Sequence, residues 1–200
     1  MTDSLKTSAL IMTSSIRPYL ESLALDADVV SAYVQELKWL SLAQLQWKPS
    51  PSAWSILECA EHLVLTARAY HPVLAEAIAK AERGSSDTTY SPTLLGRMFV
   101  KAVSPNPKFK VRTLESVTPA QTGLSAAVLD NLLSVQTERR VLLGEAAEVD
   151  INHVKIRSPL NRFLRLSAGE AFTVLIRHEE RHLQQADRVR GHEGFPAANG

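Results

Sequence analysis

Residues 167–191 of this 200-residue chain have the sequence SAGEAFTVLIRHEERHLQQADRVRG. They predict one long helix, because Ser167 and Glu170 have the spacing of a capping box at its start and Gly191 stands at its end. On such a helix, residues at alternating steps of four and three share the face that packs inward. That face consists of Ala171, Leu175, His178, His182, Gln185 and Val189. Polar side chains thus take positions that packing alone would give to leucine or isoleucine.

His178 and His182 lie one helical turn apart and only about 40° apart around the helix axis. Both imidazoles can therefore reach a point about 2 Å from each ring nitrogen, which is the distance that a divalent metal needs. A metal would give both buried rings a partner, and Gln185 could then support a ligand or contact substrate. The spacing alone is a weak signal, and two hydrogen-bonded core histidines remain the alternative.

Two helices are predicted in the first half of the chain. One starts at Asp28 as its cap and runs through Leu40, after a loose tail and a short helix near residues 16–22. The next opens with Ser55 and Glu58 in capping-box spacing and runs on toward Gly84. Pro72 lies inside this second helix and is expected to kink or split it.

A third helix is predicted from about residue 125 to 146, before the fourth at 167–191. Two connections, 84–123 and 147–166, separate these helices; the first is long enough to be functional or disordered. Within it, residues 94–103 are expected to form a short helix and 109–112 an extended segment. No convincing strand is predicted, so the fold class is all-α, a four-helix bundle. The expected domains are an N-terminal extension (1–27), the bundle (28–190) and a flexible tail (191–200).

Composition favours a single intracellular domain. The formal net charge of +1 provides no basic field for nucleic acid or a membrane surface, and neither partner is expected. Cys59 is the only cysteine, which suits a reducing cytoplasm. No segment has the features of a signal peptide or of a membrane span of about 20 apolar residues. We therefore expect a soluble, cytoplasmic protein.

His62, on the second helix, could supply a third nitrogen to the two histidines of the fourth. On a regular helix it falls near the edge of the apolar face, beside Ser55 and Thr66, rather than at its centre. Taken alone, such a residue is more often a boundary histidine than a ligand.

Two segments resemble signatures of the DinB-like superfamily. Residues 54–58 (WSILE) followed by His62 and Leu63 are similar to its second-helix signature, and residues 178–185 (HEERHLQQ) to its fourth-helix signature. Residues 107–111 with Pro119, and Ser158-Pro159 leading to Leu166-Ser167, stand where family members have similar loops. The resemblance covers roughly residues 28–190, and the order and spacing of its pieces make it fairly specific.

The resemblance implies a four-helix bundle with a long crossover and a divalent metal held by three histidines. By motif position these are His62, His178 and His182. The family includes metal-dependent enzymes that transfer small thiols such as bacillithiol or mycothiol to electrophiles, a thiol-dependent isomerase, and many proteins without known activity. The resemblance also implies that the chain forms a homodimer. The basic stretch 161–165 departs from the family pattern and leaves the ligand of this chain open.

Three functions remain open at this point. The first is a metal-dependent thiol S-transferase acting on small electrophiles, with a low-molecular-weight thiol as cosubstrate. The second is a metal-dependent hydrolase, and the third a non-catalytic dimerising bundle with a vestigial metal site. Zinc, nickel or iron would suit imidazole ligands. Glu58 and Gln185 are the supporting candidates in either enzyme, although a capping-box role explains Glu58 equally well.

The sequence HEERH also matches the zincin motif, in which the glutamate activates water. Here Glu179 should point about 100° away from the inward face, and the metzincin extension is absent, so we do not favour a protease. For the remaining candidate residues we favour a structural or solvated role over a functional one. Cys59 should be a small core residue and Trp54 should pack the helix start. His71, His153 and His192 should be solvated, and Arg162 and Arg165 should belong to a solvated loop face, although they could hold an anionic substrate.

Overall fold

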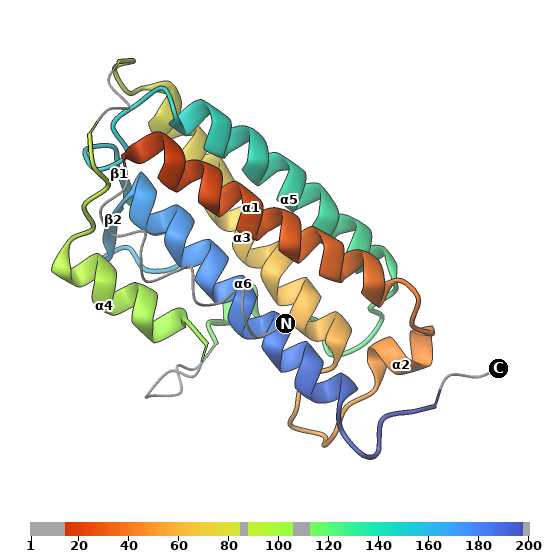
Figure 1. Cartoon of the computed structure of the whole chain (residues 1–200). Helices are drawn as coiled ribbons and strands as arrows, with labels where there is room; N and C mark the ends of the chain where they lie inside the picture. Colours follow the sequence, from red (N-terminus) through yellow and green to blue (C-terminus); the bar gives the residue numbers. More distant parts are fainter. Residues whose placement is uncertain (1–14, 85–87, 106–112, 198–200) are drawn as a thin grey trace.

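The computed structural model describes residues 15–84, 88–105 and 113–197. Four long helices lie side by side in it (Figure 1), namely α1 (Ile16–Leu37), α3 (Ile56–Ala79), α5 (Ala127–Ala146) and α6 (Ala168–Arg190). The shorter elements are α2 (Leu42–Gln46), α4 (Leu94–Val103), the 3-10 helix η3 (Glu115–Val117) and the strands β1 (Lys155–Arg157) and β2 (Arg165–Ser167). The predicted all-α class and the short helix at 94–103 are confirmed. The extended segment predicted at 109–112 lies outside the described residues.

Helix α1 begins much earlier than predicted. Its buried residues continue in alternating steps of four and three along the whole helix: Ile16, Leu20, Leu23, Ala27, Val30, Val34 and Leu37. The cap predicted at Asp28 is therefore wrong, because Asp28 lies in mid-helix and pairs with Arg140 of α5. The helix crosses the predicted domain limit at residue 28, and the domain limits themselves stay a prediction.

Helix α3 starts at the predicted capping box. The Ser55 hydroxyl accepts a hydrogen bond from the Glu58 backbone N–H (3.1 Å), and the Glu58 carboxylate accepts one from the Ser55 N–H (2.7 Å). The helix is continuous through Pro72, so a split there is wrong. Buried residues on both sides, Tyr70 and Leu74, continue one apolar face past the proline.

Helix α6 starts at the end of a small hairpin that the sequence did not predict. Strands β1 and β2 pair antiparallel with Ile156 opposite Leu166, and three-residue strands are too short to show a clear alternation. The hairpin leads directly to Ser167, whose hydroxyl accepts from the Glu170 N–H (3.2 Å) while Glu170 accepts from the Ser167 N–H (2.8 Å). Gly191 follows the last residue of the helix. Both predicted ends of α6 are confirmed.

Hydrogen bonds to the second carboxylate oxygen of Glu170 connect helix α4 to α6. That oxygen accepts hydrogen bonds from the backbone N–H (2.6 Å) and the hydroxyl (2.7 Å) of Thr93, the residue that caps α4. A Cβ atom at Gly96 would overlap the same carboxylate, so only glycine allows this approach. The connection between α3 and α5 thus carries a helix that packs beside α6 (Figure 1).

The core consists of two apolar clusters, one toward each end of the bundle. Along α6, the buried residues of the first cluster end at Ile176, and those of the second cluster begin at Ala186. The segment between them carries His178 and His182. A polar layer therefore interrupts the apolar interior of the bundle at these two residues.

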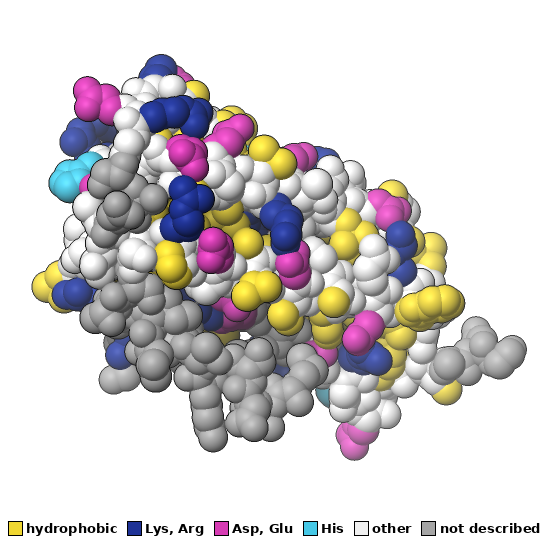
Figure 2. All heavy atoms as spheres, turned by 45° about the horizontal axis from the view of Figure 1, so that its top comes forward, with side chains coloured by type: hydrophobic (Ala, Val, Ile, Leu, Met, Phe, Trp, Pro, Cys, Tyr) yellow, Lys and Arg dark blue, Asp and Glu magenta, His cyan; other side chains and the backbone are white. Residues whose placement is uncertain are grey.

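The surface shows no segregation of charge on the face over α1 and α5. Figure 2 shows basic and acidic side chains interspersed there among smaller apolar areas, in keeping with the net charge of +1. Among the described helices, none has the length and apolar character needed to cross a membrane. Beyond Gly191, Phe195 packs edge-on against the Trp47 ring, and the carbonyl of Pro196 accepts from Gln44 (3.0 Å).

Candidate metal centre

Three histidines from two helices meet between the apolar clusters. The Nε2 atom of His178 lies 3.2 Å from Nε2 of His62 and 3.1 Å from Nε2 of His182. One ring nitrogen of each of the three lies within 4.8 Å of the other two. Two nitrogens bound to one tetrahedral zinc ion lie about 3.3–3.4 Å apart, given a Zn–N bond of about 2.0–2.1 Å. The spacing of these nitrogens thus fits a shared divalent cation.

Two of the three rings are oriented by acceptors behind them. The Nδ1 atom of His62 lies 2.7 Å from the carbonyl oxygen of Val117 in η3, and Nδ1 of His182 lies 3.1 Å from Oε1 of Gln185. Because a carbonyl oxygen can only accept, both rings donate from Nδ1, and each neutral ring then carries its lone pair on Nε2. Fixing the tautomer and direction of a ligating imidazole is the usual task of such partners.

The arrangement is poorly satisfied without a cation. If His178 is neutral, its Nε2 carries at most one proton and can donate to only one of its two Nε2 neighbours. At least one of the two neighbouring Nε2 lone pairs, on His62 or His182, then has no donor, in a site where unpaired polar atoms are costly. A metal ion accepts all three lone pairs at once, so the donor set fits a three-histidine metal site.

Burial keeps these imidazoles in the neutral form that binds metal. Burial is the main cause that lowers the pKa of His62, whereas the hydrogen bond to Val117 raises it. The pKa of His178 lies well below its ordinary value, through burial and then through His182 and His62. Burial and the neighbouring His62 and Arg181 lower the pKa of His182 to about 3. Neutral rings are required because a protonated imidazole has no lone pair to offer.

We expect the metal-free protein to lose stability as the pH falls below about 6.5. An unfolded histidine takes up a proton near pH 6.5, whereas His182 in the folded chain stays neutral down to about pH 3. The unfolded state thus binds more protons across this window, and the free energy of unfolding decreases with falling pH by up to about 1.4 kcal/mol per pH unit for each such histidine. Urea unfolding between pH 7 and pH 5.5 in the presence of a chelator measures this slope.

Two variants isolate the contribution of the cluster to that slope. His182→Gln should flatten it, whereas His153→Gln, at a histidine whose side chain is 86% exposed, should leave it unchanged. Equal slopes in the wild type and His182→Gln would contradict a neutral buried ring at position 182.

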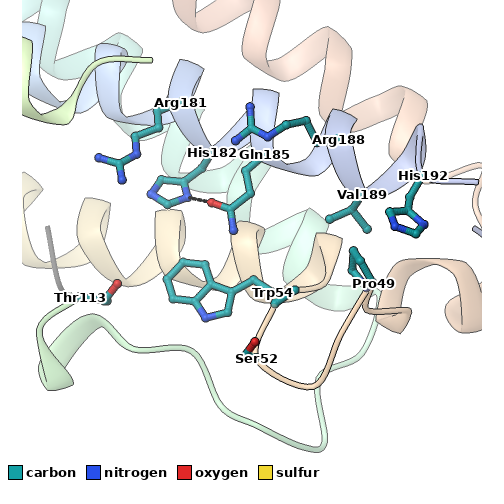
Figure 3. A pocket seen from close by; sticks show the side chains of 11 residues that line it. Pro49, Ser52, Trp54, Thr113, Arg181, His182, Gln185, Arg188, Val189 and His192 are labelled. Atoms are coloured by element: carbon teal, nitrogen blue, oxygen red, sulfur yellow. Dashed lines mark hydrogen bonds between the residues drawn. The ribbon is translucent and has the colours of Figure 1, made fainter. Parts of the chain in front are cut away.

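A cavity of about 470 Å³ opens beside His182. Figure 3 shows its wall on one side, formed by α6, and Trp54 across from His182 and Gln185. The Trp54 ring centroid lies 5.0 Å from that of His62 and 5.7 Å from that of His182. The indole therefore does more than pack the helix start, because it lines the space next to the histidines. The lining residues are Pro49, Ser52, Ala53, Trp54, Thr113, Arg181, His182, Gln185, Arg188, Val189 and His192.

The two supporting candidates have different positions. Gln185 contacts His182 and lines the cavity, as a supporting residue should. Glu58 binds the Ser55 N–H and the Lys48 ammonium (2.8 Å), which supports its capping role, and the position behind His62 is taken by Val117. Val117 lies in the long connection and no periodic pattern in the sequence indicates its role.

Glu179 faces away from the histidines, as its place on the helix predicted. Its carboxylate is buried against α5, where it pairs with Arg139 and accepts a hydrogen bond from Gln136 (2.8 Å). The geometry therefore gives no support to a zincin-like glutamate beside the metal.

The remaining histidines and the cysteine lie apart from the three-histidine group. Cys59 is buried as a core residue, and burial raises the pKa of its thiol to about 12. The prediction of a solvated His71 is wrong: it is 5% exposed, because α5 covers it, and its Nδ1 lies 3.3 Å from Glu138. His153 and His192 are exposed, as predicted.

The arginines beside the cavity differ from those considered in the sequence. Arg162 and Arg165 do not line it, and Arg162 stacks on the exposed Phe163 ring instead (4.8 Å to the centroid). Arg181 and Arg188 of α6 line it. Their spacing of seven residues, which places both on one face of the helix next to His182, was the signal that could have identified them.

Comparison with known proteins gives one family match, which spans most of the bundle and the three histidines. The family model of the DinB superfamily matches residues 26–186, which include all three histidines and most of the bundle. No curated protein and no solved structure gives a significant match to the chain. The family match covers well over half of the sequence, and it coincides with the helices that carry the histidine cluster. The chain therefore belongs to the DinB superfamily.

Proposed function

We propose that the protein holds one divalent metal ion on His62, His178 and His182 and transfers a low-molecular-weight thiol to a small electrophile. The observation that supports this most directly is the convergence of three Nε2 atoms, two of them on rings that donate from Nδ1 to Val117 and Gln185. The family resemblance and the adjoining cavity support the same function.

The bound ion would supply an open coordination position, where it lowers the pKa of a thiol and so provides thiolate near neutral pH. The chain's own residues prepare the site. Val117 and Gln185 hold two rings in the ligating tautomer, and burial keeps the rings neutral. Trp54 offers a flat face on which a planar electrophile can stack.

The residues lining the cavity favour thiol transfer over hydrolysis. The part of the cavity lined by described residues contains no aspartate, glutamate or lysine, and the Nδ1 atom of His192, the candidate base there, already accepts a hydrogen bond from the Gly194 N–H (3.1 Å). Glu179, the glutamate expected in a zincin-type hydrolase, is engaged with Arg139. The thiol for such a transfer comes from outside the chain, since Cys59, its only cysteine, is buried and its thiol has a raised pKa. A cytoplasmic location, which we also propose, would keep such a thiol reduced.

Turnover that needs both metal and thiol is the expected result. Protein loaded in turn with zinc, nickel or iron would be incubated with bacillithiol, mycothiol or cysteine and 1-chloro-2,4-dinitrobenzene, and the thioether product followed by absorbance. His178→Ala provides the blank for the spontaneous reaction, because it lacks the central ligand. Ester or amide cleavage without added thiol would instead identify a hydrolase. Stoichiometric metal with neither activity would identify a non-catalytic module.

A further inference from the structure

Two guanidinium groups stand beside the histidine cluster. Arg181 and Arg188 lie seven residues apart on α6, so both project from the same face two turns apart. Figure 3 shows them on either side of His182 and Gln185, on the wall across from Trp54. A molecule that fills this cavity next to the histidines therefore lies beside two positively charged side chains.

Neither arginine has an acidic partner within the described residues. Arg181 donates to the carbonyl oxygen of Ala102 at 3.5 Å, and no ion pair there joins Arg181 or Arg188 to a carboxylate. By contrast, Arg139 pairs with Glu179 and Arg140 with Asp28. The described cavity lining contains no carboxylate either. The positive charge of this wall is thus not neutralised by the chain around it.

The two charges also act on each other. Burial lowers the pKa of the Arg181 guanidinium, and the charge of Arg188 lowers it further. Arg181 is half-buried and Arg188 is exposed, and two like charges that face one cavity without a counter-charge repel each other, so an anion bound between them removes that repulsion. A planar carboxylate matches the fork of a guanidinium with two parallel hydrogen bonds.

We infer that Arg181 and Arg188 form an anion subsite and that one reactant of this site carries a carboxylate. The inference rests on the proposed function for the identity of that reactant. The cavity volume of about 470 Å³ suits one small molecule, with its planar part on Trp54 and its carboxylate on the guanidiniums. The carboxylate can belong to the electrophile or to the thiol, and the chemistry of recognition is the same for both.

A matched pair of aryl chlorides represents the electrophile. With 4-chloro-3-nitrobenzoate, the thiol sulfur forms a bond to the carbon that bears chlorine, the C–Cl bond breaks and chloride leaves with its electron pair. The thiol proton passes to the buffer, and the carboxylate is unchanged. The neutral partner, 4-chloro-3-nitrobenzamide, undergoes the same reaction without the charge. A second pair, 3-mercaptopropionate and 3-mercaptopropionamide, tests the thiol in the same way.

Binding is measured first, by calorimetry on the metal-loaded protein and with each probe alone. We expect one of the two carboxylates to bind about tenfold or more tightly than its amide, as for a charge-assisted hydrogen bond to arginine. Arg181→Gln and Arg188→Gln should each remove most of this preference. Arg190→Gln is the matched control, since it removes the same charge from an exposed position of α6 that does not line the cavity.

The outcomes separate this inference from the proposed function. Equal binding of acid and amide in both pairs would overturn the subsite, and so would a preference that survives in both Arg181→Gln and Arg188→Gln, because the carboxylate would then bind elsewhere. A preference that depends on the arginines, in a protein that catalyses no thiol transfer, would uphold the subsite and refute the transferase. Metal content of each variant, expected to equal that of the wild type, confirms that the centre is intact.

Discussion

Replacing Glu179 by alanine is expected to lower the free energy of unfolding by about 3–5 kcal/mol, because it leaves the Arg139 guanidinium buried without a counter-charge. The side chain of Arg139 is fully buried and that of Glu179 is 3% exposed. With total stabilities of about 5–15 kcal/mol typical of domains, this is a large fraction. For a chain of this length the melting temperature should fall by roughly 6–20 °C. Urea unfolding and calorimetry of the metal-free protein measure both quantities.

The expected loss is large because the network has no spare partner. Gln136 donates to one oxygen of Glu179 (2.8 Å) and accepts from Arg139 (3.2 Å), so all three side chains depend on the one carboxylate. The Nε and Nη2 atoms of Arg139 have no hydrogen-bond partner among the described residues. Removing Glu179 therefore leaves a cation that the surroundings cannot satisfy.

Two further variants show whether the uncompensated charge is the cause. Arg139→Met combined with Glu179→Leu removes both charges at similar volume, and it should recover most of the stability, as replaced buried pairs often do. Glu148→Ala breaks the exposed pair with Arg17 and should cost no more than about 1 kcal/mol. If Glu179→Ala were as mild as Glu148→Ala, the buried pair would not be holding α5 to α6.

A further variant, Glu179→Gln, tests the direction of Glu179 on the helix. A zincin-like role would make Glu179→Gln lose catalysis while it kept its stability and its metal. The structure predicts the reverse, a loss of stability in a protein that still binds metal when folded, since the carboxylate faces α5 and not the histidines.

The fold was predictable where one helix carried its own signals. Helix α6 has a capping box, a terminal glycine and an inward face in one continuous segment, so its limits and its two histidines follow from the sequence. Helix α1 has the same kind of inward face. Asp28 obscured it, because a charged residue on the solvent side of a helix resembles a cap when the chain is read linearly.

The candidate site was predictable only in part, because its remaining pieces come from loops. The position of His62 on a helical wheel is marginal, and it is buried because Trp54, in the loop before α3, and Val117, at the end of η3 in the long connection, cover it. Neither loop has a periodicity from which such a contact follows. Arg139 was missed for a related reason: an arginine in a charged helix resembles a surface residue until the partner on the neighbouring helix is known.

His178→Ala is expected to abolish stoichiometric metal binding while the bundle stays folded. His178 is the central residue of the group, since its Nε2 lies within 3.2 Å of both other Nε2 atoms. Without it, two nitrogens remain for the ion, too few for the three-ligand site that typical catalytic zinc centres use. The metal content of protein purified without a histidine tag, measured by plasma mass spectrometry, should fall from about one ion per chain to less than a tenth of that.

Stability measurements show whether the ion binds the folded chain at this site. A ligand present at about a thousand times its dissociation constant stabilises a protein by about 4 kcal/mol, so metal should raise the melting temperature of the wild type clearly. It should leave that of His178→Ala unchanged. His153→Ala, at the exposed histidine, is the matched control and should behave as the wild type does. A full metal response in His178→Ala would refute the centre.

Gln185→Ala should have a metal affinity between those of the wild type and His178→Ala. If Gln185 had only a structural role, its replacement would leave the metal affinity unchanged. The three ligands remain, but Nδ1 of His182 loses the oxygen that fixes its tautomer and direction. Loss of such a partner typically weakens metal binding by about 10- to 100-fold, and competition with a chelator of known affinity measures the change. Glu58→Gln should keep the wild-type affinity, because Val117 and not Glu58 orients His62. An order of wild type, then Gln185→Ala, then His178→Ala would show that the ion binds where the three imidazoles converge, whereas wild-type affinity in Gln185→Ala would place it elsewhere.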